Sequence, residues 1–280
     1  MKTNFVAFLN KHGIACASDT DMTLYALSKK EPVAIAVNPY SPIPWDNIIN
    51  AYLRQGDIAL HDDFVDYARD FAEFLKTVNS QKKWAGLTDE EANIIFLGFG
   101  QDDLFPSGVD AYVRHNTTSN ILECELREVC RIDHKNTSNY GMLGKFENMQ
   151  PVLYGISDAA KTSLADRQEK DMNKYKERMK KALDNAHCDV ALDDMPYDTQ
   201  NAFSNELEDM INYHQDRLID TVASFNIEDM VKVAETFIDA NDQLEHLKAG
   251  GFGNPNSTKE LAVITRTEGL VWIKHCLFGL

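Results

Sequence analysis

The sequence lacks the signatures of several large protein classes. It has five cysteines in 280 residues, and no two of them form a C-x-x-C pair. Zinc knuckles and redox dithiols use such pairs, so neither is indicated. No apolar run reaches the roughly 18 residues of a membrane-spanning helix, and the first residues do not resemble a secretory signal. We therefore expect a cytoplasmic protein with reduced cysteines.

Positive charge is also scarce. The chain carries 28 lysine and arginine residues against 44 aspartate and glutamate residues, which gives a net charge of −16. A surface this acidic repels phosphate backbones and anionic membranes, so neither nucleic acid nor a membrane is expected as a partner. Apolar residues make up 44% of the chain, too many for a disordered polypeptide. The length suits one large domain or two small ones.

Common motifs of cofactor and catalytic sites are missing as well. There is no G-x-x-x-x-G-K-[ST] phosphate loop, no G-x-S-x-G nucleophile elbow and no H-E-x-x-H zinc motif. Gly98-Phe99-Gly100 follows an expected strand but lacks the third glycine of a dinucleotide site. The pairs Asp102-Asp103 and Asp193-Asp194 are typical of solvated loop charges rather than of a cation site. We therefore expect no cofactor and no metal.

Short apolar strands dominate the start of the chain. Residues 5–9 and 13–17 read as two strands joined by a tight hairpin, and residues 24–27 and 33–37 read as a second hairpin. These runs are nearly apolar on both faces. Strands of this kind are covered on two sides, as in a layered sandwich.

The rest of the chain mixes helical and strand patterns. Apolar residues recur at helical spacing in 45–53 and 64–78, and His61 and Asp62 are candidate N-terminal residues of the second helix. The remaining expected elements are helices at 158–185, 207–222 and 230–238, strands at 93–99, 109–114, 122–132, 261–265 and 270–274, and a loop at 189–201.

Two features of this order bear on the fold. Apolar and charged residues alternate in 122–132, which places Cys124 and Cys130 together on the inner face of that strand. Strands at both chain ends with helices between them predict an α+β fold in one domain. The strongly charged segment near 158–200 reads as a helical insertion into that domain.

A threonine near the start is the most informative residue. Thr3 opens the first expected strand, and Asp19 follows the end of the second. Paired antiparallel strands run in opposite directions, so a short hairpin brings these two positions together. A threonine hydroxyl becomes a nucleophile when an amine or another base takes its proton. The alternative is that Thr3 is an ordinary strand residue and Asp19 a turn former.

The order of elements resembles that of proteasome-type β subunits and their bacterial relatives. The stretches that carry this resemblance are 17–19 (A-S-D), 27–28 with 32–37, 43–49, 96–107 and 260–274, which together span nearly the whole chain. The resemblance implies an N-terminal-nucleophile (Ntn) hydrolase fold, a four-layer αββα sandwich. Residues 1–280 would then form one proteasome-like domain with the charged insertion near 158–200.

The resemblance also assigns catalytic roles. Thr3 matches the family's threonine nucleophile, whose own amine acts as the base, and Asp19 matches its orienting aspartate. The family's activating lysine falls on Thr23. The glycine that helps to hold the oxyanion falls near Asn38-Pro39, where proline has no N–H to donate.

Two functional interpretations follow from the resemblance. In the first, the chain is a threonine-type peptidase subunit that hydrolyses a peptide or protein substrate through Thr3 and Asp19. In the second, it is a catalytically degenerate relative that serves as a structural or interaction protein, because Thr23 replaces the lysine and Met1-Lys2 precede Thr3. A more distant alternative is an Ntn amidohydrolase for a small amide. The family implies a homo-oligomer, either a ring or stacked rings.

Overall fold

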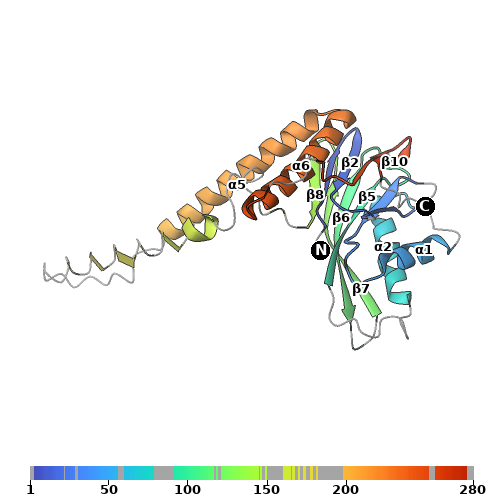
Figure 1. Ribbon diagram of the computed structural model, residues 1–280, viewed down its shortest axis with the longest axis horizontal. Helices are drawn as coiled ribbons and strands as arrows, with labels where there is room; N and C mark the ends of the chain where they lie inside the picture. Colours follow the sequence, from blue (N-terminus) through green and yellow to red (C-terminus); the bar gives the residue numbers. More distant parts are fainter. Residues whose placement is uncertain are drawn as a thin grey trace. The chain divides into compact units, whose positions relative to one another are not determined.

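The structure is a computed structural model in which two antiparallel sheets are combined with helices (Figure 1). It describes residues 3–21, 23–28, 31–55, 60–78, 91–116, 118, 121–144, 146, 149, 160–164, 166–167, 170, 173–174, 177–178, 181, 198–251 and 256–275. The chain is therefore an α+β protein, as the order of elements predicts.

The first sheet joins the beginning and the end of the described chain. Its strands, in spatial order, are β10 (Gly269–Lys274), β9 (Glu260–Thr265), β2 (Gly13–Ser18), β1 (Phe5–Asn10) and β8 (Ser138–Leu143). The hairpin of β1 and β2 has a two-residue turn, which sets the pairing Phe5 to Ser18 and Asn10 to Gly13. Both strands are buried along their whole length, in agreement with their apolar character on both faces.

The second sheet is built from consecutive strands of the middle of the chain. Its strands, in spatial order, are β3 (Leu24–Ala26), β4 (Val33–Ala36), β5 (Glu91–Gly98), β6 (Ser107–Asn116) and β7 (Ile121–Arg131). All of the pairs are antiparallel, so each strand returns beside the previous one.

Helices cover one face of each sheet, and the two remaining faces pack together. The helices are α1 (Trp45–Leu53), α2 (Phe64–Thr77), α5 (Asp198–Ser224) and α6 (Ile227–Lys248). One apolar cluster joins α1 and α2 to the second sheet, and α6 packs on β1, β2 and β9 of the first. A second cluster, which includes Phe5, Cys16, Ala36 and Leu97, fills the space between the sheets.

The strand β8 was not expected from the sequence. Its residues, from Ser138 to Leu143, are mostly polar or small and show no apolar alternation. The segment is a strand because its backbone pairs with β1 along the edge of the first sheet. The prediction of a loop over 189–201 was wrong at its end, since α5 already begins at Asp198.

The two cysteines of β7 do not share a face, contrary to the prediction. The pairing of β6 with β7 shifts between Val109 and Ala111, which marks a β-bulge. A bulge adds one residue and so reverses the side-chain alternation beyond it. As a result Cys124 packs against the helix-covered cluster and Cys130 against the cluster between the sheets.

The chain divides into two compact units. One comprises Met1–Phe146 with Ile219–Leu280, and the other comprises Glu147–Leu218. In the second unit, the described residues between 160 and 181 are helical and nearly all exposed, as expected for a charged helix. Part of the helix expected at 158–185 lies outside the described residues, including its apolar residues Met172, Tyr175, Met179 and Leu183. No described helix is both long and apolar enough to cross a bilayer.

The N-terminus of α2 lies one residue beyond His61 and Asp62, the two residues expected to begin this helix. Asp63 is the N-cap, and its Oδ1 accepts a hydrogen bond from the amide of Val65 at 2.9 Å. Its Oδ2 accepts a second bond from Arg131 on β7 at 2.6 Å. The Nε2 atom of His61 instead lies 2.5 Å from Oδ2 of Asp70. Asp63 therefore both begins the helix and ties it to the second sheet.

Replacing Asp63 with alanine is expected to lower the free energy of unfolding by about 1 kcal/mol at pH 7. Burial acts to raise the pKa of Asp63, but the bonds from Arg131 and Val65 outweigh it and hold the pKa below its usual value. A depressed pKa stabilises the fold above the unfolded-state pKa, and this stabilisation is lost as pH falls through the folded-state pKa. The difference between wild type and Asp63→Ala should thus shrink below about pH 4, as measured by urea unfolding. An equal difference at pH 7 and pH 3 would contradict this.

Candidate functional site

Thr3 lies buried at the entrance to β1. The residue is 2% exposed. Its hydroxyl donates a hydrogen bond to the side-chain oxygen Oδ1 of Asn38 at 3.2 Å and accepts one from the hydroxyl of Thr20 at 3.1 Å. Asn38 follows β4 of the second sheet, so this contact joins the two sheets at their ends.

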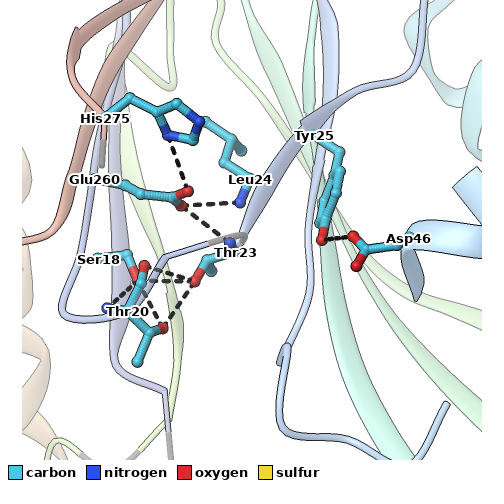
Figure 2. A network of polar contacts seen from close by, with 8 residues as sticks. All are labelled: Ser18, Thr20, Thr23, Leu24, Tyr25, Asp46, Glu260 and His275. Carbon is cyan, nitrogen blue, oxygen red and sulfur yellow. Dashed lines mark hydrogen bonds and ion pairs between the residues drawn. The ribbon is translucent and has the colours of Figure 1, made fainter. Parts of the chain in front are cut away.

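Three further hydroxyls extend this contact into a cluster (Figure 2). The Oγ1 atom of Thr23 lies 2.9 Å from that of Thr20 and 3.0 Å from Oγ of Ser18. Ser18 and Thr20 are themselves 3.3 Å apart. We call Thr3, Ser18, Thr20 and Thr23 the hydroxyl cluster. Each hydroxyl can both donate and accept, so the buried members satisfy one another without a charge.

Asp19 makes a separate set of contacts. Its Oδ1 accepts the backbone amide of Asn4 at 2.8 Å, and its Oδ2 accepts the side-chain amide of the same residue at 2.7 Å. Burial raises the pKa of Asp19. The two bonds from Asn4 oppose this rise, and the nearby carboxylates of Asp242 and Glu245 on α6 add to it.

The structure does not bring the side chains of Thr3 and Asp19 together. Because Phe5 pairs with Ser18, Thr3 stands opposite Thr20 and Asn4 stands opposite Asp19. Neighbouring residues of a strand point to opposite faces of the sheet. Thr3 accordingly faces the second sheet, while Asp19 faces α6 and its acidic residues.

The positions that matched the family's lysine and glycine are occupied by polar, uncharged groups. Thr23 is fully buried in the hydroxyl cluster. The Oδ1 of Asn38 also accepts the amide of Tyr40 at 3.0 Å, which fixes the asparagine side chain over Thr3. Among the described side chains, no lysine or arginine hydrogen-bonds to the hydroxyl of Thr3. Lys29 and Lys30, the lysines nearest to Thr23 in the sequence, lie outside the described residues.

Glu260 and His275 adjoin the cluster and were not found from the sequence. The Oε2 atom of Glu260 accepts the backbone amides of Thr23 at 3.0 Å and of Leu24 at 3.2 Å (Figure 2). The Nδ1 atom of His275 lies 3.3 Å from its other oxygen. A sequence signal existed for Glu260, which is a single acidic residue at the start of an otherwise apolar strand, Glu260-Leu261-Ala262.

This arrangement has little capacity for nucleophilic chemistry. The proton of the Thr3 hydroxyl is directed at an amide oxygen, which is far too weak a base to take it. At the position where the resemblance expects an oxyanion donor, Pro39 has no N–H, and such a donor is typically worth about 3 to 4 kcal/mol of transition-state stabilisation. Within the described part of the chain, no group of three or more His, Cys, Asp or Glu side chains could hold a metal ion.

No family model matches the sequence. A search of curated proteins finds no match either.

Proposed function

We propose that the chain is a catalytically degenerate, proteasome-like member of the Ntn-hydrolase superfamily that serves as a structural or interaction protein. The order of the elements supports the superfamily assignment. So does the stacking of two antiparallel sheets, with α1 and α2 on one outer face and α6 on the other.

The environment of Thr3 carries the proposal of degeneracy. A threonine nucleophile needs a base for its proton and a cation that favours the alkoxide. Here the hydroxyl is 2% exposed and bonded to an amide oxygen and to another hydroxyl. Met1 and Lys2 also precede Thr3, and a peptide-bonded nitrogen cannot serve as the base.

The active threonine peptidase is the competing function. It would require removal of Met1 and Lys2, a cationic group beside Thr3 and movement of Asn38 away from the hydroxyl. The matching positions of Thr3 and Asp19 in the sequence favour it, but their side chains lie in different hydrogen-bond groups. The degenerate interpretation therefore accounts for more of the contacts.

A labelling experiment with a β-lactone, which acylates reactive threonine hydroxyls, tests the proposal. We expect the purified protein to keep the mass of the full chain and to take up no label, like the Thr3→Ala variant. The hydroxyl of a buried, unactivated threonine does not attack an acyl carbon at a measurable rate. Intact-mass spectrometry measures both the N-terminus and the label.

A mass that begins at Thr3, with a label that disappears in Thr3→Ala, would overturn the degenerate interpretation in favour of the peptidase. Native mass spectrometry of the same sample tests the proposed homo-oligomer. We expect an assembly whose mass is a multiple of the 31.7 kDa chain. A stable monomer at micromolar concentration would contradict the proposed assembly.

A further inference from the structure

One buried carboxylate connects three distant segments beside the hydroxyl cluster. Glu260, the first residue of β9, is 2% exposed. It accepts the amides of Thr23 and Leu24 at the start of β3, in the other sheet. It also pairs with His275, directly after β10. Burying a carboxylate is costly unless it is paired and hydrogen-bonded, so these contacts hold the three segments together.

The contacts continue from Glu260 to Thr3. Glu260 holds the backbone of Thr23, and the hydroxyl of Thr23 lies 2.9 Å from that of Thr20. Thr20 in turn donates to Thr3. Thr20 is half-buried, whereas Thr23 and Thr3 are buried. Thr20 is thus the member of this chain of hydroxyls that lies nearest the surface, and it bonds both to Thr3 and to Thr23.

His275 is the part of this arrangement that solvent reaches. Its side chain is 27% exposed, against 3% for the side chain of Glu260, and its ring stacks on Trp272 with the centroids 4.2 Å apart. The charge of Glu260 also acts on Cys16 and Tyr25, although the hydroxyl of Tyr25 points to Asp46 on α1 (Figure 2). Burial raises the pKa of both groups. The hydrogen bond to Asp46 raises that of Tyr25 further, and the charge of Glu260 adds to the rise in both, so both stay neutral near pH 7. His275 is therefore the solvent-reached side chain beside the Glu260 carboxylate.

We propose that Glu260 and His275 form a latch that keeps Thr20 and Thr23 closed over Thr3. Release of the latch exposes the Thr3 hydroxyl without unfolding the sheets. The inference rests on the proposed function, because it explains how a proteasome-like fold without catalysis keeps its threonine position buried. A contact that draws the half-exposed His275 away from Glu260 would open this end of the sandwich.

The test uses a cysteine probe at the covered position. Thr3→Cys is combined with Glu260→Gln, which keeps the side-chain shape but removes the charge, or with His275→Phe, which keeps the stack on Trp272. Alkylation by a maleimide is followed by tryptic peptide mass spectrometry, in which residues 3–11 form their own peptide. We expect either latch variant to accelerate labelling of residue 3 about tenfold or more, because each changes one partner of the Glu260–His275 contact and so favours local opening.

Two controls separate local release from general loosening. Glu235→Gln removes a carboxylate that pairs with Lys274 at the same end of β10, and it should leave the labelling rate of residue 3 unchanged. Cys124 packs in the helix-covered cluster and should label slowly in every variant. Equal labelling of residue 3 with and without the latch variants would overturn the latch, as would a parallel rise at Cys124.

A second measurement avoids dependence on one variant. Hydrogen exchange at the amides of Thr23 and Leu24 should be faster in His275→Phe than in wild type. Unchanged exchange would overturn the latch. This test remains valid even if Glu260→Gln does not fold. Failure of the proposed function gives a different result. In that case the wild-type protein itself takes up the β-lactone at Thr3, whatever the latch variants do.

Discussion

Replacing Gly98 with alanine is expected to lower the free energy of unfolding by about 3 kcal/mol or more. Gly98 ends β5 with a φ of 154°, a conformation that residues with a side chain rarely adopt. A Cβ there would overlap the carbonyl oxygen of Pro32 and lie 2.9 Å from Cα of Val33. These are backbone atoms of the first residue of β4 and of the residue just before it, so relief requires β4 and β5 to separate.

Gly108→Ala provides the matched control in the same sheet. A Cβ at Gly108 would meet side-chain atoms of Leu9 and Leu97 at 3.5 Å, which is ordinary van der Waals contact. We expect this variant to change the free energy of unfolding by about 1 kcal/mol or less. Urea unfolding followed by tryptophan fluorescence measures both. Equal urea midpoints for the two variants would show that the backbones of β4 and β5 are not in close contact at Gly98.

Truncating Phe71 to alanine is expected to cost about 3 to 5 kcal/mol. Phe71 lies on α2 with no exposed surface, and its ring centroid is 5.1 Å from that of Tyr52 on α1 and 5.8 Å from that of Phe96 on β5. One ring therefore joins two helices to the second sheet, and its removal leaves a cavity that three separate elements would have to fill.

The contrasting variant is Leu104→Ala. Leu104 is a large apolar residue that is 80% exposed, so its truncation should change the free energy of unfolding by less than about 0.5 kcal/mol. Urea unfolding measures both variants. A loss below 1 kcal/mol for Phe71→Ala would mean that the α1–α2 layer contributes little to the stability of the sheets. It would also weaken the case that the helix layer is part of the same domain.

Local patterns predicted most of the elements. The apolar runs in β1 and β2 and the helical spacing in α2 are properties of a few consecutive residues, and the strands and helices formed where these patterns occur. The hairpin turn also settled which residues face one another, because a two-residue connection permits a single register. β8 carries no such pattern, and it became a strand through pairing with β1.

The candidate site was harder to predict from the sequence than the strands and helices. The sequence pointed to Thr3 and Asp19 by their places at the ends of a hairpin, and the register then directed their side chains to opposite faces. Thr23 was singled out in the sequence because the resemblance places the family's activating lysine at that position. Its actual partners, the hydroxyls of Ser18 and Thr20 and the carboxylate of Glu260, follow from the packing of the two sheets.

By itself, the sequence determined the acidic character of the chain, the strands and helices with clear periodicity and the hairpin that places Thr3. The tertiary structure alone decided what surrounds Thr3. Its hydroxyl meets Asn38, 35 residues away, and Glu260 meets the amide of Thr23 across 237 residues. Periodicity depends on neighbouring residues, whereas such contacts arise when two sheets pack against each other and bury polar groups that must then find partners.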